Sequence, residues 1–304
     1  MSMKPVAKNA EEQAVGAIIA RIVETRLEDL RLALENQNLN LEQALAYIAE
    51  CRSRIYDEII ENGLGRGGEK GMAGFIAEWL EVYIGNAKEV VLGKAAKFVL
   101  DNDNGAVDYH VADVAFQSKY VLKYLAIDSV LEHSEKYPDF VKSGGRYTIP
   151  ADFFARIQKL ASVPESSVHD LPGPDQTIWN KIQRLKAAGI EPGDNLQPSA
   201  FKYLDARREH VDATIDRERA EVRSRDAGVR KEIEGEHRPN VGEATQAVIV
   251  GAALEAGLDL ALGVYKKIKD GKRIADFTSE DWQELGIEVL AGGAKGGVRG
   301  GAVY

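Results

Sequence analysis

Cysteine is almost absent from the sequence, since Cys51 is the only one among 304 residues. A single cysteine excludes an intrachain disulfide framework and a zinc site built from cysteines. A reducing compartment is the simplest setting for such a chain, so we expect a cytoplasmic protein. The opening segment MSMKPVAKNAEEQ also lacks the apolar core of a secretory signal.

Long apolar runs and an excess of positive charge are missing as well. No stretch of about eighteen uncharged apolar residues is present, so we expect no conventional membrane span. The net charge of −9 excludes a protein coated in basic charge for indiscriminate nucleic-acid binding. The composition is otherwise ordinary, with 44% hydrophobic and 29% charged residues and room for two domains.

Residues 1–70 carry a helical pattern, in which Ile, Val and Leu recur at helical spacing. ENQNLNLEQ at residues 35–43 interrupts this pattern. We therefore predict a helical hairpin that covers the core or forms a dimer. The glycine-rich segment Asn62–Gly71 is predicted to be a linker, and it lacks the GK[ST] ending of a nucleotide-binding Walker loop.

Residues 71–162 are predicted to form an α+β core, with a small mixed sheet of four or more strands flanked by helices. The expected elements are a helix over 72–91, a strand in AKFVL, a hairpin of Val107–Val111 and Val114–Val121, a helix over Leu122–Lys136, a strand in RYTIP and a helix over Ala151–Leu160. The hairpin is predicted from two apolar runs joined by the tight Ala112-Asp113 connection.

Polar side chains inside that hairpin are the best clue to function. Asp108 lies near the start of the first run, and Gln117 and Lys119 lie in the second. Side chains alternate along a strand, so Gln117 and Lys119 share a face. If Asp108 shares that face, a carboxylate, an amide oxygen and an ammonium converge. Carboxylate and carbonyl oxygens suit Mg²⁺, and a nearby lysine can orient water or stabilise a phosphate.

This arrangement resembles the PD-(D/E)xK nuclease superfamily, in the Mrr-like variant in which glutamine replaces the second acid. The resemblance covers about Gly71–Leu160 and implies a restriction-endonuclease-like core of helix, three strands, helix and strand. It also implies a glutamate on the first helix that faces the metal. Glu78 in GFIAEWLE matches this place, and Glu81, one turn further on, is the competing choice.

The resemblance implies Mg²⁺ or Mn²⁺ as cofactor, with Asp108, Gln117 and Glu78 as metal ligands and Lys119 as the residue that positions water. Basic residues near the motif are candidates for binding the substrate phosphates: Lys123, Lys142 and Arg146. The alternative reading is that Asp108 is a solvent-exposed turn residue, that Gln117 and Lys119 form the exposed face of an ordinary strand, and that Glu78 is a solvated helix residue. The Lys142–Tyr147 loop has the alternative reading of a solvated turn. Glutamine supplies a neutral oxygen, which allows either weaker metal binding or an inactive nuclease retained as a scaffold.

Residues 163–304 are predicted to form a helical C-terminal region. Segments rich in proline precede and follow a helix at Thr177–Ala188, and we expect the core to end there. Ser199–Glu236 is predicted to be a long, solvent-exposed charged helix. Glycine pairs spaced four residues apart mark Gly292–Gly301, as either a close-packing helix face or a flexible tail.

Two functions from different classes follow from these patterns. The leading one is a metal-dependent nuclease that hydrolyses DNA, with RNA as an alternative substrate, in defence against foreign DNA. Its helical regions would form a homo-oligomer. The alternative is a helical assembly or membrane-surface effector in which the nuclease-like segment is a non-catalytic scaffold. The positions of Glu78, Asp108, Gln117 and Lys119 discriminate between the two, because only a nuclease needs them at one point.

Overall fold

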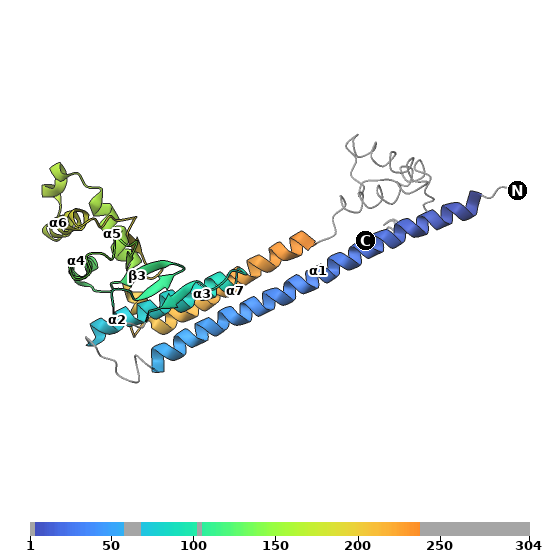
Figure 1. Cartoon of the computed structure of the whole chain (residues 1–304), viewed down its shortest axis with the longest axis horizontal. Coiled ribbons are helices and arrows are strands. Elements are labelled where there is room, and N and C mark those ends of the chain that lie inside the picture. The colour runs from blue at the N-terminus through green and yellow to red at the C-terminus, as the bar shows by residue number, and fades with distance from the viewer. Residues whose placement is uncertain (1–3, 58–67, 102–104, 238–304) are drawn as a thin grey trace. The chain divides into compact units, whose positions relative to one another are not determined.

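The computed structural model describes residues 4–57, 68–101 and 105–237 of the chain (Figure 1). Two compact units are present, one of residues 36–229 and the other of residues 1–35 together with 230–304. In the second unit the described residues are helical, and Arg31 forms ion pairs with Glu28 at 2.7 Å and Glu35 at 2.5 Å. The glycine pairs near the C-terminus and most of the glycine-rich linker lie outside the described residues.

The described residues form seven α-helices and a five-stranded mixed sheet. In chain order the elements are α1 (Lys4–Arg54), α2 (Gly68–Trp79), η2 (Leu80–Ile84), α3 (Gly85–Val90), β1 (Phe98–Leu100), β2 (Tyr109–Val111), β3 (Val114–Ser118), η3 (Lys123–Ala126), α4 (Ile127–Lys136), β4 (Arg146–Ile149), α5 (Ala151–Ala161), η4 (Glu165–Asp170), α6 (Gly173–Ala187), β5 (Leu196–Pro198), η5 (Tyr203–Ala206) and α7 (Val211–His237). The predicted α+β class is confirmed, as is the order of helix, three strands, helix and strand.

The sheet has the strand order β1-β2-β3-β4-β5. Its first three strands pair antiparallel, and β3, β4 and β5 pair parallel. The predicted hairpin is present, with Ala112-Asp113 joining β2 to β3, and Ala112 has the left-handed φ of 52° that such short turns require. The outer edge of β1 is partly covered by Asn86, whose side chain bonds the backbone N and O of Phe98.

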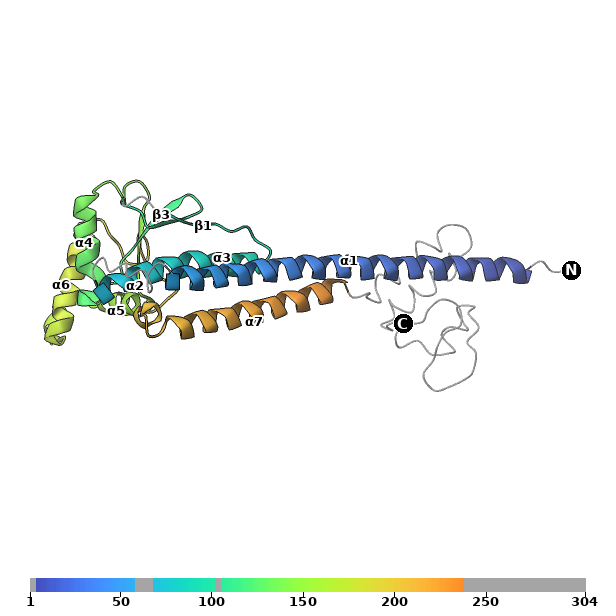
Figure 2. The ribbon, with the colours of Figure 1, turned by 90° about the horizontal axis from the view of Figure 1, so that it is seen from below.

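Helices flank the sheet and bury one large hydrophobic cluster, and a second, smaller cluster is formed by Val82, Tyr109 and Phe116. α4, α5 and α6 lie side by side at one end of the residue 36–229 unit (Figures 1 and 2). The largest fully buried side chains come from many parts of this unit, and they include Ile48, Ile76, Tyr147, Ile182 and Phe201. Burial of this apolar surface stabilises the unit at about 25 cal/mol per Å².

The helix before the sheet changes its winding at Leu80–Ile84, which forms a π-helical segment between α2 and α3. A π segment contains one more residue per turn than the flanking α-helix, and it is often found at functional sites. It therefore changes the direction in which the side chains before and after it point. Glu78 precedes the segment, whereas Glu81 lies inside it.

The predicted N-terminal hairpin is wrong, because α1 runs without a break through ENQNLNLEQ at residues 35–43. Asn and Gln lower helix propensity only slightly, and tertiary contacts override the difference here. The buried Gln37 donates hydrogen bonds to Val91 O at 3.0 Å and to Asp226 Oδ1 at 2.9 Å. These bonds tie α1 to the end of α3 and to α7, so the polar residue belongs to the packed side of the helix.

The folded unit extends past the predicted core, because β5 pairs with β4 and α6 packs on α5. The predicted helix at Ser199–Glu236 begins only at Val211, and one side of it is buried at Thr214, Ile215 and Val222. Within the described ranges, no helix is long and apolar enough to cross a membrane.

Candidate active site

Asp108 and Gln117 lie close together where the β2–β3 pairing begins. The register of β2 and β3 pairs Tyr109 with Phe116 and His110 with Ala115. Asp108 directly precedes β2, and its backbone N donates to Phe116 O at 2.8 Å, which places Asp108 beside the Phe116–Gln117 part of β3.

The two side chains are in direct contact. Gln117 Nε2 donates a hydrogen bond to Asp108 Oδ2, and Ser118 N donates to the same oxygen at 2.7 Å. Gln117 is almost fully buried, with 4% of its surface exposed. The remaining carboxylate oxygen of Asp108, Oδ1, takes part in neither bond. The pair is therefore a fixed group, in which a strand amide and a backbone N–H orient the carboxylate.

Glu78 on α2 and Lys119, the residue after β3, complete the group. Burial is the main cause that raises the pKa of Glu78 well above its ordinary value, and the charge of Asp108 raises it further while Lys119 lowers it. Lys119 is half-buried, and burial lowers its pKa while Asp108 and Glu78 oppose that change. All four residues predicted from the sequence therefore lie within electrostatic or hydrogen-bonding reach of one another.

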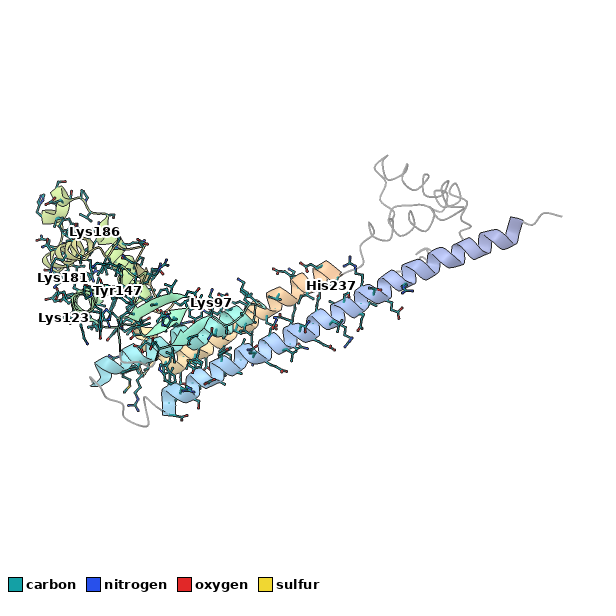
Figure 3. All side chains as sticks on the ribbon, in the orientation of Figure 1. Lys97, Lys123, Tyr147, Lys181, Lys186 and His237 are labelled. Carbon is teal, nitrogen blue, oxygen red and sulfur yellow. The ribbon has the colours of Figure 1, made fainter. Side chains whose placement is uncertain are left out.

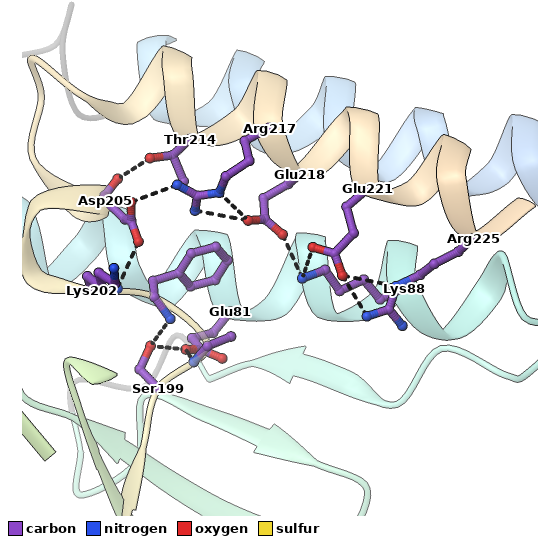
Figure 4. Close-up of polar contacts among 12 residues, drawn as sticks. Glu81, Lys88, Ser199, Lys202, Asp205, Thr214, Arg217, Glu218, Glu221 and Arg225 are labelled. Atoms are coloured by element: carbon purple, nitrogen blue, oxygen red, sulfur yellow. Dashed lines mark hydrogen bonds and ion pairs between the residues drawn. The ribbon is translucent and has the colours of Figure 1, made fainter. Parts of the chain in front are cut away.

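The alternative acid on the helix, Glu81, has a different environment. Its carboxylate accepts a hydrogen bond from Ser199 Oγ and another from Ala200 N at 2.9 Å, as Figure 4 shows for Ser199. Glu81 is buried, and this burial raises its pKa despite the two hydrogen bonds. The structure thus assigns Glu78, and not Glu81, to the group around Asp108.

Burial also governs the protonation of Asp108. It raises the pKa of this carboxyl, whereas Lys119 and the hydrogen bonds from Ser118 and Gln117 lower it. Two carboxylates, Asp108 and Glu78, therefore share one poorly hydrated place with a single ammonium. Negative charge in such a place is costly unless a cation accompanies it.

Two residues of α4 belong to the surroundings of Lys119 and were not predicted. Charge links these residues: Lys136 lowers the pKa of Lys119, and Lys119 and Lys136 lower the pKa of His133. Burial is the main cause that brings the pKa of His133 to about 4. Its Nδ1 lies 3.0 Å from the hydroxyl of Tyr147, the residue paired with Gln117. His133 and Lys136 lie three residues apart in α4, so their side chains share one face of the helix. This spacing was the signal available in the sequence, but it does not show which face of α4 meets the sheet.

The predicted phosphate-binding residues do not form one group. Lys142 is exposed and pairs with Asp139 at 3.2 Å. Arg146 pairs with Phe116 in the β3–β4 register, so it projects from the face of the sheet opposite to Gln117. Lys123 lies four residues beyond Lys119, with its ammonium 5.1 Å from the ring centroid of Tyr124 (Figure 3). Of the three, Lys123 is the one next to the candidate site in the chain.

The residues present suit a divalent cation with oxygen ligands. Within the described ranges, no group of three or more His, Cys, Asp or Glu side chains is arranged to hold a metal ion. The group here has two carboxylates, and its third oxygen donor is the amide of Gln117. Mg²⁺ is commonly held by one or two carboxylates and keeps several waters. A dication would also balance the negative charge of Asp108 and Glu78, which are both partly buried.

Comparisons with known proteins add no relative. No protein family, curated protein or solved structure matches the chain.

Proposed function

We propose that this protein is a metal-dependent nuclease that hydrolyses phosphodiester bonds in DNA. The observation that supports the proposal best is the convergence of Glu78, Asp108, Gln117 and Lys119, which come from α2 and from the β2–β3 hairpin with its flanking residues. Four residues chosen from a sequence pattern have no reason to meet if the pattern is accidental. The resemblance to PD-(D/E)xK nucleases implies this set, and it suggests defence against foreign DNA and a cytoplasmic location as the setting.

In this proposal, each side chain has a separate task. Asp108, Glu78 and the amide oxygen of Gln117 hold Mg²⁺ or Mn²⁺, which when bound stabilises negative charge on the scissile phosphate. Lys119 orients the attacking water and adds positive charge beside the phosphate. Ser118 N and Gln117 Nε2 keep Asp108 in position. Positioning and charge stabilisation account for most of the catalysis of phosphate-ester cleavage.

The test is cleavage of plasmid and linear DNA, and of RNA, by the purified protein with Mg²⁺, Mn²⁺ or EDTA. We expect metal-dependent cleavage that falls at least about 100-fold in Lys119→Ala, which removes a stabilising charge. Asp108→Asn should lose cleavage and bind the metal more weakly. Lys97→Ala is the matched control, because Lys97 pairs with Glu89 on the β1 side (Figure 3). Full activity in Lys119→Ala would refute the assignment.

A second candidate function is a helical assembly with a non-catalytic scaffold. Leu32 and Leu39 on α1 are exposed and lie seven residues apart, the spacing of a helix–helix seam. Sedimentation of the protein and of a Leu32→Gln/Leu39→Gln variant tests self-association. A monomer at micromolar concentration would remove this candidate, and it would also remove the homo-oligomer from the nuclease proposal.

A further inference from the structure

Three apolar side chains stand in solvent directly after the candidate active site. Val121 is 40% exposed, Leu122 61% and Tyr124 37%. They follow Lys119 within a single short segment, Val121–Tyr124, which we call the 121–124 segment. Isolated exposed apolar residues are common, but a contiguous set next to a polar site indicates a binding surface.

The 121–124 segment is held rigidly at both ends. Before it, the buried Tyr120 hydroxyl donates to Phe201 O at 3.1 Å. After it, Leu125 and Ala126 are buried. Tyr124, Leu125 and Ala126 all have left-handed φ angles, of 48°, 55° and 64°. Non-glycine residues adopt this conformation only when the surrounding structure imposes it, and such strain is concentrated at functional sites.

Two lysines flank the ring of Tyr124. The ammonium of Lys123 lies 5.1 Å from the ring centroid, and that of Lys181 on α6 lies 4.3 Å from it (Figure 3). Lys181 also pairs with Asp128 at 2.6 Å, so its charge is balanced and it fixes the ring. Lys123 is exposed and belongs to the segment itself, which leaves it able to meet an anion.

We propose that the 121–124 segment binds unpaired nucleotides of the DNA strand that enters the candidate active site. This inference rests on the proposed nuclease function. Aromatic rings that stack on bases, together with cations that meet phosphates, are the combination by which proteins bind single strands. Bases inside a duplex are stacked on each other, so only unpaired nucleotides have a free face, which would replace the exposed Lys123 ammonium on the ring of Tyr124.

The position of the 121–124 segment in the chain supports contact of one DNA strand with both this segment and Lys119. Tyr124 is five residues beyond Lys119, so their Cα atoms are at most about 18 Å apart. A lipid surface is the other class of partner for exposed apolar groups beside a lysine. Surface-bound helices need a long amphipathic face, however, and this segment overlaps a turn of only four residues, Lys123–Ala126, whose backbone is not that of a regular helix.

The experiment measures binding of fluorescent single-stranded and double-stranded DNA by anisotropy, with EDTA present so that nothing is cleaved. We expect the protein to bind single strands more tightly than duplex. Tyr124→Ala should weaken single-strand binding by about 5- to 100-fold, the usual effect of losing one stacking residue. Tyr124→Phe should keep it. Lys123→Ala should weaken it and reduce its salt dependence.

Two further variants separate a binding role from a folding role. Tyr124→Asn tolerates the left-handed backbone and removes the ring, so it should bind as weakly as Tyr124→Ala. Leu204→Ala is the control, because Leu204 is an exposed apolar residue (57%) on η5, and its loss should leave binding unchanged. Circular dichroism and Tm establish that each variant is folded.

The inference is overturned if the wild-type protein does not prefer single strands, or if folded Tyr124→Ala and Tyr124→Asn bind them as well as the wild type. Tyr124-dependent binding to vesicles of anionic lipid, with no strand binding, would overturn it in favour of a membrane. Failure of the nuclease proposal is distinguishable, because it appears as absent cleavage while Tyr124-dependent strand binding persists.

Discussion

At the scale of single residues, the amide of Gln117 distinguishes this site from one lined by carboxylates alone. It is buried and bonded to Asp108, so it keeps one unit of negative charge out of a place that already holds two acids. The neutral side chain thus lowers the electrostatic cost of holding Asp108 and Glu78 close together without a cation. It also lowers the electrostatic attraction for a dication.

Gln117→Glu tests this balance. Without metal, it places a third carboxylate in contact with Asp108, so we expect a loss of about 1–3 kcal/mol in stability, or roughly 2–4 °C in Tm per kcal/mol. Mg²⁺ should restore the Tm and support cleavage. Gln117→Leu removes the amide oxygen and should be inactive with either metal. Thermal unfolding with and without Mg²⁺ provides the comparison, and equal metal responses in both variants would mean that Gln117 is not a ligand.

Glu81 leads to a prediction about pH. Burial places its folded-state pKa above the ordinary value of 4.5, so the folded protein binds this proton more tightly than the unfolded chain does. The resulting contribution to stability is full below pH 4.5 and is lost as the pH rises through the folded-state pKa.

Glu81→Gln keeps an oxygen that can accept from Ser199 and Ala200 and has no charge to bury. We expect the Tm of the variant to rise relative to that of the wild type as the pH increases from 4.5 to roughly 8. Unfolding curves over this pH range measure it. A difference that is constant with pH would contradict the prediction.

At the scale of elements, long-range polar contacts hold helices that the sequence does not mark as partners. Lys88 on α3 bonds Glu218 of α7 at 2.6 Å and Glu221 at 3.2 Å, and Arg217 joins Glu218 to Asp205 (Figure 4). Glu218 is buried, so its pairing is needed to offset desolvation. These contacts fix α7 against the helix that carries Glu78.

Gln37 likewise links α1 to α3 and α7 through hydrogen bonds. Replacing it tests how much such a contact contributes to stability. Gln37→Ala removes the hydrogen bonds from this side chain to Val91 O and to Asp226 Oδ1, so we expect a loss of about 1–3 kcal/mol in the free energy of unfolding. Leu39→Ala, at an exposed position on the same helix, should change it by less than about 0.5 kcal/mol. Urea denaturation compares the two. A smaller effect for Gln37→Ala than for Leu39→Ala would argue against this bridging role.

At the scale of the whole molecule, the core is shared by segments far apart in the chain. Ile48 of α1, Ile182 of α6, Leu196 of β5 and Ile215 of α7 belong to the same buried cluster as Ile76 of α2. The site group at Asp108 rests on this common core, although all four of its residues lie between positions 78 and 119.

Two fragments of the chain test whether the core depends on these distant segments. A fragment of residues 36–229 should fold and unfold cooperatively, because it is a compact unit with its own core. A fragment of residues 71–162 should not, because it lacks α1, β5 and α7 and exposes the surface they cover. NMR dispersion and urea denaturation report the outcome. A cooperatively folded 71–162 fragment would show that the outer helices are dispensable.

The sequence by itself determined the order of helix, three strands, helix and strand in the core, and the hairpin that carries Asp108, Gln117 and Lys119. Alternating apolar runs and the Ala112-Asp113 turn predict the hairpin, and the period of two then places Gln117 and Lys119 on one face. These are local properties, since strand alternation and turn chemistry depend on neighbouring residues alone.

Only the tertiary structure decided which partners the elements have. The choice of Glu78 over Glu81, the addition of His133 and Lys136, and the continuity of α1 through ENQNLNLEQ all depend on contacts between distant segments. Local preferences differ by only a few tenths of a kcal/mol per residue. Burial and buried hydrogen bonds contribute more, and they depend on side chains that the linear order does not bring together.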